Sequence, residues 1–243
     1  MNWSDEGIIL STRPHGETAA IVELLTRAHG RHAGLVYGGR SRRLRPVLQI
    51  GNHVDVSWKG RLADHLGHMT VELRKGYAAT AMDNALALAG LTSLCALVRL
   101  LPERDPHPNL YGITLYVLGF LDDEAVWPAL YARWELALLG ELGFGLDLSE
   151  CASTGATDHL AFVSPKSGRA VSAMAGQLYK DRLLPLPAFL MGRAPLDVAR
   201  SDVLAGLALT GHFLEARALR PRELAFPEAR QRLAALIARA RDA

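Results

Sequence analysis

Residues 54–59 read Val-Asp-Val-Ser-Trp-Lys, with an apolar side chain at every second position. The same alternation returns at residues 69–73, which read Met-Thr-Val-Glu-Leu. In a β-strand, a period of two places the apolar side chains on one face and the polar side chains on the other. Both segments are therefore expected to be strands with one buried face, with Trp58 in the core and Lys59 on the outside.

Three further strands are expected upstream, at residues 7–12, 20–26 and 32–37. Glycine-containing breaks at residues 14–17 and 29–31 separate them. Five short strands with a single apolar face are most simply closed into a small barrel, because closure leaves no strand edge unpaired. The sequence therefore predicts an oligonucleotide-binding (OB) type β-barrel as the first domain, residues 1–80.

Beyond residue 81 the apolar residues recur with the period of helices. Residues 85–98 carry no charge and form a segment shorter than the ~20 residues that a membrane-spanning helix needs, so a buried helix is expected. Apolar stripes at helical spacing follow at Leu94, Leu97, Val98 and Leu101, at Ile113, Tyr116, Val117 and Phe120, and at Trp127, Leu130, Tyr131, Trp134 and Leu138.

Two more helices are expected near the end of the chain. One runs from Asp197 to Ala216, started by Pro195, and the other covers residues 227–240. An irregular segment at about 147–169, rich in Ser, Thr, Gly and Asp, precedes them. The expected fold class is thus α+β with two domains, in which an all-α helical domain at residues 81–243 carries this insertion.

The formal net charge of +2 hides an uneven distribution. Residues 1–80 hold eleven Lys or Arg and seven Asp or Glu, whereas residues 81–243 hold sixteen and eighteen. Between residues 27 and 75 the basic residues exceed the acidic ones by seven. Such a field favours a polyanionic partner, and nucleic acid fits better than a membrane surface because no basic amphipathic helix accompanies it.

The most basic segment, residues 38–45, reads Gly-Gly-Arg-Ser-Arg-Arg-Leu-Arg. Arginine contacts phosphate oxygens through its planar fork and also stacks on bases. The two glycines predict a mobile arm whose backbone can approach a ligand closely. A solvated charged loop is the plain alternative, but no acidic residue lies between Arg27 and Leu48 to neutralise the arm.

Other candidate contacts to nucleic acid come from the strands and their ends. Lys59 and Arg61 belong to the outward side of the barrel, where a phosphate backbone can follow the strands and loops. Tyr37, beside the two glycines, is a candidate for base stacking, whereas Trp58 is expected inside. The full set of candidate DNA-binding residues is Arg31, Arg40, Arg42, Arg43, Arg45, Lys59 and Arg61.

Metal binding has little support in the sequence. His29 and His32, like His65 and His68, are three residues apart but lie in strand or turn context without nearby cysteines or paired carboxylates. They are expected to be solvated histidines that add positive charge below neutral pH. Cys151 opens a loop similar to a zinc knuckle, but no second ligand follows it at knuckle spacing.

Catalysis has equally little support. The sequence contains no phosphate-binding loop, no nucleophile elbow and no carboxylate pair for two-metal chemistry. We therefore expect a non-enzymatic protein without cofactor, metal, small-molecule substrate or membrane partner. The acidic start of the chain lacks the features of a secretory signal, which predicts a cytoplasmic location.

Several short motifs occur in a fixed order along the chain. In the first domain they are Asp-Glu-Gly-Ile-Ile-Leu at residues 5–10, Gly-Glu at 16–17, His-Gly-Arg at 29–31, Gly-Gly-Arg-Ser at 38–41 and Leu-Gln-Ile-Gly at 48–51. In the second they begin with Trp-Glu-Leu at 134–136 and continue through residues 142–144, 146–148, 151–155 and 210–214. In order and spacing they resemble the RecO family of bacterial DNA repair and recombination mediators, in its alphaproteobacterial form.

The resemblance implies an N-terminal OB barrel and a helical domain that carries a four-cysteine zinc site in some members. This chain keeps only Cys151, so the insertion is expected to be a degenerate, zinc-knuckle-like loop without metal. The resemblance also implies binding to single- and double-stranded DNA, annealing of complementary strands, and action with RecR in loading RecA. A further implied partner is the acidic C-terminal tail of single-strand-binding protein, and the implied location is the cytoplasm, at the nucleoid.

Two other functions stay open on the sequence alone. One is a non-catalytic adaptor whose helical domain binds proteins and whose basic half binds RNA or an acidic protein. The other is a nuclease or other phosphotransfer enzyme, which would require metal-dependent turnover. For the DNA-binding hypothesis, neutralising ~5 phosphates predicts a logarithmic salt slope of roughly −3 to −4 on single strands, with no base-sequence preference.

Overall fold

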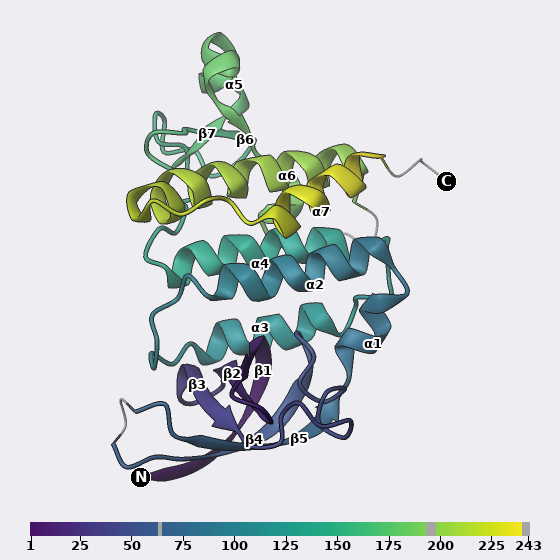
Figure 1. The fold of residues 1–243 in the computed structure, drawn as a ribbon. Coiled ribbons are helices and arrows are strands. Elements are labelled where there is room, and N and C mark those ends of the chain that lie inside the picture. The colour runs from purple at the N-terminus through teal and green to yellow at the C-terminus, as the bar shows by residue number, and fades with distance from the viewer. Residues whose placement is uncertain (63–64, 193–197, 240–243) are drawn as a thin grey trace. The chain divides into compact units, whose positions relative to one another are not determined.

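The computed structural model of the chain describes residues 1–62, 65–192 and 198–239 (Figure 1). Contacts group these residues into two compact units. Unit 1 is Met1–Asp122 with Pro227–Arg230, and unit 2 is Asp123–Phe226 with Gln231–Ala243. Unit 1 holds all strands of the barrel and also the first three helices. The domain boundary near residue 80 stays a prediction.

The barrel of unit 1 is closed, with the strand order β1-β2-β3-β5-β4. Its strands are β1 (Asn2–His15), β2 (Ala19–Thr26), β3 (Gly30–Val36), β4 (His53–Lys59) and β5 (His68–Lys75). Neighbours pair antiparallel except β3 and β5, which meet in parallel where Leu35 lies opposite His68. The five-stranded, OB-type barrel predicted from the alternation is confirmed.

Strand β1 begins five residues earlier than the sequence predicts. Residues 2–8 pair with β4, where Trp3 lies opposite Trp58, and residues 7–15 pair with β2, with an irregularity between Ile9 and Ser11. Residues 2–6 read Asn-Trp-Ser-Asp-Glu and lack the apolar alternation that marks a strand. Pairing with β4, a partner distant in sequence, therefore decides their conformation.

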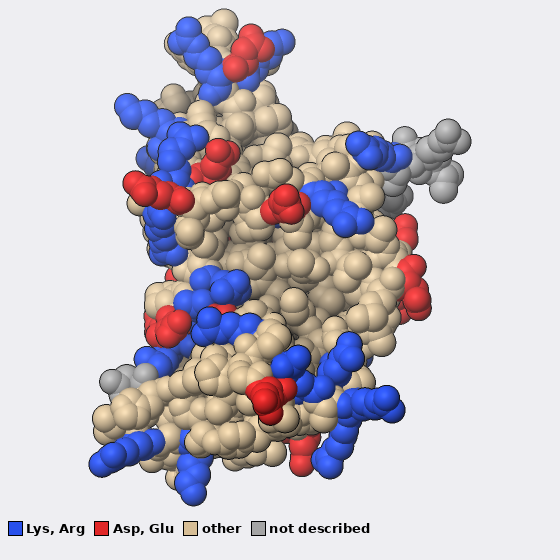
Figure 2. Space-filling view, viewed as in Figure 1, with Lys and Arg blue, Asp and Glu red and all other residues tan. Residues whose placement is uncertain are grey.

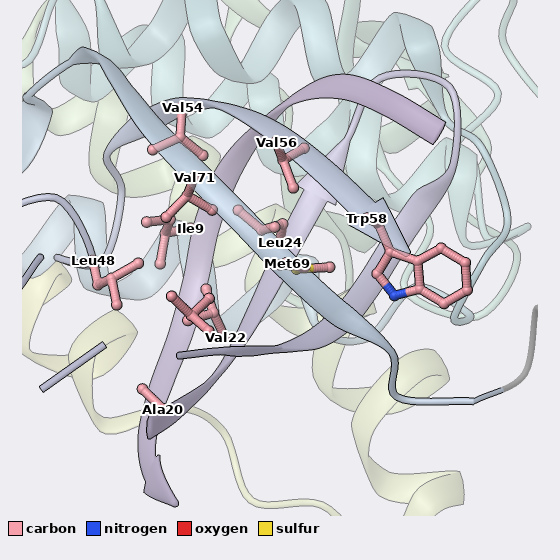
Figure 3. Close-up of a cluster of buried hydrophobic side chains, with 11 residues drawn as sticks. Ile9, Ala20, Val22, Leu24, Leu48, Val54, Val56, Trp58, Met69 and Val71 are labelled. Carbon is pink, nitrogen blue, oxygen red and sulfur yellow. The ribbon is translucent and has the colours of Figure 1, made fainter. Parts of the chain in front are cut away.

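The core of the barrel confirms the alternation in β4 and at Met69 and Val71 of β5, but the expected burial of Leu73 is wrong, since Leu73 lies near the end of β5 and is 46% exposed. In β4 every second residue is buried, and Trp58 is 1% exposed at one end of the cluster shown in Figure 3. Its Nε1 donates to the carbonyl oxygen of Leu66 at 3.1 Å. A Cβ on Gly60 or Gly67 would lie 2.4–2.5 Å from the indole ring, so both residues must be glycine. The buried cluster comprises Ile9, Ala20, Val22, Leu24, Val36, Leu48, Val54, Val56, Trp58, Met69 and Val71.

The expectation that the histidines are solvated is wrong for His32. Its side chain is buried in the barrel, with its ring edge-on to Trp3 and Trp58 at centroid distances of 5.1 and 5.0 Å. Neither ring nitrogen has a hydrogen-bond partner among the described residues. Burial, with the nearby positive charge of Arg104, lowers the pKa of His32 from 6.5 to about 4. His32 is therefore neutral at physiological pH and adds no charge to the surface.

The lowered pKa of His32 makes the stability of unit 1 depend on pH. Between pH 6.5 and pH 4 the unfolded chain protonates His32 and the folded chain does not, so the free energy of unfolding falls as the pH falls. The full loss should reach roughly 3 kcal/mol. Urea unfolding of His32→Phe should lack this part of the acid dependence. Identical pH profiles for the two proteins would contradict the assignment.

Three helices complete unit 1: α1 (Tyr77–Met82), α2 (Ala85–Val98) and α3 (Pro108–Leu118). Helix α2 coincides with the uncharged segment, and the Oδ1 of Asn84 caps it by accepting from the backbone N–H groups of Leu86 and Ala87. The short α1 was not predicted. Its Ala78 N–H donates to the Oδ1 of Asn52 at 3.0 Å, which ties α1 to the end of the β3–β4 connection.

The apolar stripe predicted on α3 is wrong at Ile113 and Tyr116, which are exposed, and right at Val117. The helix also buries Leu110, Tyr111, Thr114 and Leu118. The apolar residues of α3 are spread over all sides of the helix, so helical spacing alone allows more than one apolar stripe. The buried face includes Thr114 because its hydroxyl donates to the carbonyl oxygen of Leu110 at 2.7 Å and is thereby satisfied.

Unit 2 is built on α4 (Trp127–Glu141) and α6 (Arg200–Phe213), which pack on each other. The Oγ1 of Thr210 donates to the buried carboxylate of Glu135 at 2.6 Å between them. The stripe predicted on α4 is confirmed, since Trp127, Tyr131 and Trp134 are fully buried. The helical elements from α4 onward are α4 (Trp127–Glu141), α5 (Ala173–Gly176), η1 (Gln177–Arg182), η2 (Ala188–Leu190), α6 (Arg200–Phe213), η3 (Leu214–Leu219), η4 (Arg220–Arg222) and α7 (Glu228–Arg239).

The helical second domain is confirmed, with the addition that three short strands interrupt its helices. They are β6 (Leu160–Val163), β7 (Ala170–Ser172) and β8 (Leu184–Pro185), in the order β7-β6-β8. Strands of this length are too short to show an alternation in sequence. The expected helix starts at Pro195 and Asp197, and the expected end at Ala240, lie outside the described residues. None of the helices in the described ranges is long and apolar enough to span a bilayer.

Candidate nucleic-acid interface

The β3–β4 connection, residues 37–52, carries the predicted arginine arm and is called here the arginine loop. It folds as consecutive turns, in which the N–H of Arg45 donates to the carbonyl oxygen of Ser41 and that of Leu48 to Leu44. Leu48 is buried in the barrel core, and Leu44 and Val47 pack against the same core. In place of the predicted mobile arm, the structure shows a hydrogen-bonded loop anchored by apolar side chains.

The two glycines at the start of the arginine loop serve its backbone. Gly38 has a φ of +64°, a left-handed conformation that glycine adopts without strain. A Cβ on Gly39 would lie 2.8 Å from the Cβ of Ala20, so the loop is packed closely against β2 at this point. The glycines are therefore explained by the turn itself, and the expected approach of a ligand is not needed to account for them.

The arginine loop presents its guanidinium groups to solvent. Arg42, Arg43 and Arg45 are exposed, and none makes an ion pair with any residue that the structure describes. Arg40 is exposed too, but its Nη1 donates to the carbonyl oxygens of Gly16 and Glu17 at 3.1 and 2.9 Å. Arg40 thus fastens the loop to the β1–β2 turn, while the other three arginines have their charge available for a ligand.

A second group of basic side chains surrounds the β4–β5 connection, whose residues 63–64 lie outside the described part. Lys59 and Arg61 are exposed, as predicted from the alternation in β4. With His65 and His68 they line a hollow of about 290 Å³. Lys and Arg side chains project into solvent around the barrel in Figure 2, which uses the same view as Figure 1. In OB-type barrels this connection commonly contacts oligonucleotides.

Tyr37 joins the two basic groups. It opens the arginine loop, is 66% exposed, and stacks on His68 at the start of β5 with ring centroids 4.8 Å apart and planes 25° apart. A stacked, solvent-facing pair of rings offers a flat surface for an unpaired base. The structure therefore keeps Tyr37 as a candidate for base stacking and adds His68 beside it.

Other basic residues of the polarised segment are already paired with acids inside unit 1. The Nη1 of Arg31 lies 2.5 Å from the Oε1 of Glu23, and only 15% of its side chain is exposed. Arg74 contacts the carboxylates of Glu6 and Asp55. These arginines stabilise the barrel and have little charge left for a ligand. Arg31 is the one predicted contact that the structure sets apart from the exposed group.

Two further hollows flank the arginine loop. One, of about 420 Å³, is lined by Arg40, Arg45 and Gln49 together with residues of β1 and β2. The other, of about 510 Å³, lies between the loop and α1, with Leu73 and Met82 among its apolar residues. Gln49, Leu73 and Met82 could not be predicted as residues of this site, because uncharged residues carry no signal of it until the fold brings them beside the arginines.

Cys151 in the insertion is part of a closed hydrogen-bond network. Its sulfur is buried and accepts from the backbone N–H of Ser172 at 3.2 Å. Hydrogen bonds from Thr154 and Ser172 lower the pKa of the thiol to about 6. Within the described ranges, no three or more His, Cys, Asp or Glu side chains form a group able to hold a metal ion. The described residues around Cys151 therefore do not fit a four-cysteine zinc site.

Comparison with known proteins agrees with the resemblance found in the motifs. The family model described as "Recombination protein O N terminal" matches residues 1–77, and "Recombination protein O C terminal" matches residues 82–224. The DNA repair protein RecO of Methylobacterium nodulans is 53% identical over 240 residues, 97% of this chain and 98% of the relative. Those of Rhodospirillum centenum and Rhodopseudomonas palustris are 53% identical over 235 and 237 residues, covering 96% and 95% of this chain and 93% of each relative. The chain belongs to the RecO family of DNA repair and recombination proteins.

Proposed function

We propose that this protein binds single- and double-stranded DNA through unit 1 and acts as a recombination mediator that anneals complementary strands. The observation that carries the proposal is the set of five exposed basic side chains without an ion pair among the described residues: Arg42, Arg43, Arg45, Lys59 and Arg61. They stand on two connections of an OB-type barrel, and phosphate is the ligand that suits such a group. The proposed place of action is the cytoplasm, at the nucleoid.

Annealing requires two polyanions to approach each other. Basic side chains that neutralise phosphates lower this repulsion and release counterions, and they do so without reading the bases. The stacked pair of Tyr37 and His68 adds a platform that every base can occupy, since each base has a π-face. The proposed activity therefore needs no sequence preference and no bond making or breaking by the protein.

The annealing activity should depend on the arginine loop. With labelled complementary strands, the wild-type protein should speed duplex formation, and the speed should fall steeply as salt is added. Replacing Arg42, Arg43 and Arg45 by Ala should remove most of the acceleration. If the wild-type protein left the rate unchanged at low salt, the annealing part of the proposal would be wrong while DNA binding could still stand.

The proposed partners are RecR and the acidic C-terminal tail of single-strand-binding protein, as the resemblance implies. On strands coated with single-strand-binding protein, addition of this protein with RecR should shorten the delay before RecA assembles. The matched control uses single-strand-binding protein without its acidic tail. An equally short delay with and without the tail would exclude the tail as a partner.

The proposed function is non-catalytic. Labelled single- and double-stranded DNA should remain intact on incubation with the protein and Mg²⁺ or Mn²⁺, because the described residues offer no carboxylate cluster for metal-assisted phosphodiester chemistry. Gel electrophoresis of the labelled strands measures this directly. Metal-dependent shortening that survives further purification would instead support a nuclease.

One observation favours a second candidate, the adaptor. Helix α5 and the adjoining η1 expose three apolar side chains, Met174, Leu178 and Tyr179, which are 86, 88 and 57% accessible. Exposed apolar groups of this kind are common where a protein partner binds. Comparing the affinities for single-stranded DNA, RNA and an acidic peptide at two salt concentrations separates the candidates. The adaptor predicts that RNA or the peptide binds more tightly than DNA.

A further inference from the structure

The hollow between the arginine loop and α1 is the feature with the most unassigned chemistry. It measures about 510 Å³, a volume typical of small-ligand pockets. Arg42, Arg45, Pro46, Gln49 and Asn52 form its loop side, and Leu73, Gly76, Ala78, Ala79 and Met82 form the side of β5 and α1. We propose that this hollow receives an unpaired base of single-stranded DNA, whose phosphates contact Arg42 and Arg45. The inference rests on the proposed DNA binding and adds a place for the base.

The walls of the hollow suit the face of a base. Leu73 and Met82 are 46% and 58% exposed, so both present apolar surface to the solvent-filled space. A methionine side chain is flexible and its sulfur makes favourable contacts with aromatic rings. A flat, aromatic base would cover these two side chains and remove their apolar area from water.

One polar group in the hollow is available to a base. Asn52 is buried and its amide is engaged, since its Nδ2 donates to the carbonyl oxygens of Pro46 and Val47 and its Oδ1 accepts from the N–H of Ala78. Gln49 donates through Nε2 to the carbonyl oxygen of Arg45 at 2.9 Å. Its Oε1 accepts no hydrogen bond from the described residues and is left to accept from the edge of a base.

The charge of the hollow matches a nucleotide. Two guanidinium groups line it, and its lining among the described residues includes no acid. Arg45 and Gln49 also line the hollow on the other side of the loop, so they form a wall between the two. A phosphate bound at Arg45 would leave its two flanking nucleotides above different hollows. The arginine loop would thus separate neighbouring bases of one strand.

This arrangement predicts a preference for single strands. In a duplex, the bases are paired and stacked, and turning one outward breaks these interactions. In a single strand the bases are free to enter the hollow, and stacking on protein side chains then adds affinity. The phosphate contacts serve both forms of DNA, whereas the hollow adds affinity only for the single strand.

The test fills the hollow from an exposed position. Ala79 lies on α1 within the lining, and Thr80 is its exposed neighbour outside the lining. Ala79→Phe should weaken binding of a labelled single strand by about tenfold and leave duplex binding unchanged. Thr80→Phe, which adds the same ring to the same helix, should change neither affinity. Met82→Ala, a second variant at an exposed position, should weaken single-strand binding several-fold.

An abasic single strand, which has phosphates and no bases, shows whether the base is responsible. Wild type and Ala79→Phe should bind it equally well. Equal affinity of Ala79→Phe and wild type for the normal single strand would overturn the inference, as would an equal loss on single strand and duplex. A loss of affinity for an acidic peptide alone would assign the hollow to a protein partner and overturn it too. In each case, loss of DNA binding on replacing Arg42, Arg43 and Arg45 would still support the proposed function.

Discussion

Replacing Arg42, Arg43 and Arg45 together by Ala lowers the affinity for single-stranded DNA on the order of a hundredfold at low salt. Each charge-assisted contact with a phosphate contributes roughly 1 kcal/mol to the free energy of binding, and three such contacts are lost. The three side chains are exposed and have no ion pair among the described residues, so the folded state loses no ion pair with them. Fluorescence anisotropy with a labelled strand measures the affinity, and the thermal midpoint should stay nearly unchanged.

The matched control removes the same charge elsewhere. Lys166, Lys180 and Arg182 are exposed residues of unit 2, outside both basic groups of the barrel. Their joint replacement by Ala changes the net charge of the protein equally but should weaken DNA binding much less. If both triple variants lost affinity to the same extent, total charge would explain binding, and the arginine loop would have no special role.

Replacing Trp58 by Ala destabilises unit 1 by about 3–5 kcal/mol, the usual effect of emptying a large buried aromatic site. The indole is fully enclosed in the barrel, and its Nε1 hydrogen bond to Leu66 is lost with it. Urea unfolding measures the loss. Trp58→Phe retains part of the packing and should be less destabilised, with single-strand affinity close to wild type while it is folded.

Tyr37→Ala should show the opposite pair of effects. Its side chain is two-thirds exposed, so its removal should change the free energy of unfolding much less than Trp58→Ala does. Losing the surface on which a base stacks should weaken single-strand binding about tenfold. Weak DNA binding by folded Trp58→Phe together with normal binding by Tyr37→Ala would mean that the two aromatic residues had been assigned the wrong roles.

The barrel could be predicted from the sequence because each of its strands is marked by a short pattern of neighbouring residues. Alternation over six residues at β4 and five at β5 is enough to specify two strands, and three more follow from turns and apolar runs. Prediction from local patterns failed where the pattern was compatible with more than one structure. Helix α3 has apolar residues on all sides, and the face that is buried depends on packing that no local pattern encodes. The polar start of β1 likewise depends on its pairing with β4.

The sequence predicted that basic residues form the candidate site, but it did not predict which of them are free of ion pairs among the described residues. Counting charges identified the basic segment, but it could not separate Arg31, paired with Glu23 and near Glu103, from Arg42. That separation depends on where acids distant in sequence come to lie in the fold. His32 illustrates the same limit, because a histidine in a strand can face either water or the core. The hollow beside α1 could not be foreseen, since α1 itself was not predicted.

We propose that exposed cations on two connections of the barrel bind the phosphates of DNA. The slope of the logarithm of single-strand affinity against the logarithm of salt concentration measures how many phosphates they bind. Five bound phosphates predict a slope of about −3.5 for the wild type, and loss of Arg42, Arg43 and Arg45 should reduce it to about −1.4. A wild-type slope near zero, or an equal slope in the triple variant, would contradict the claim.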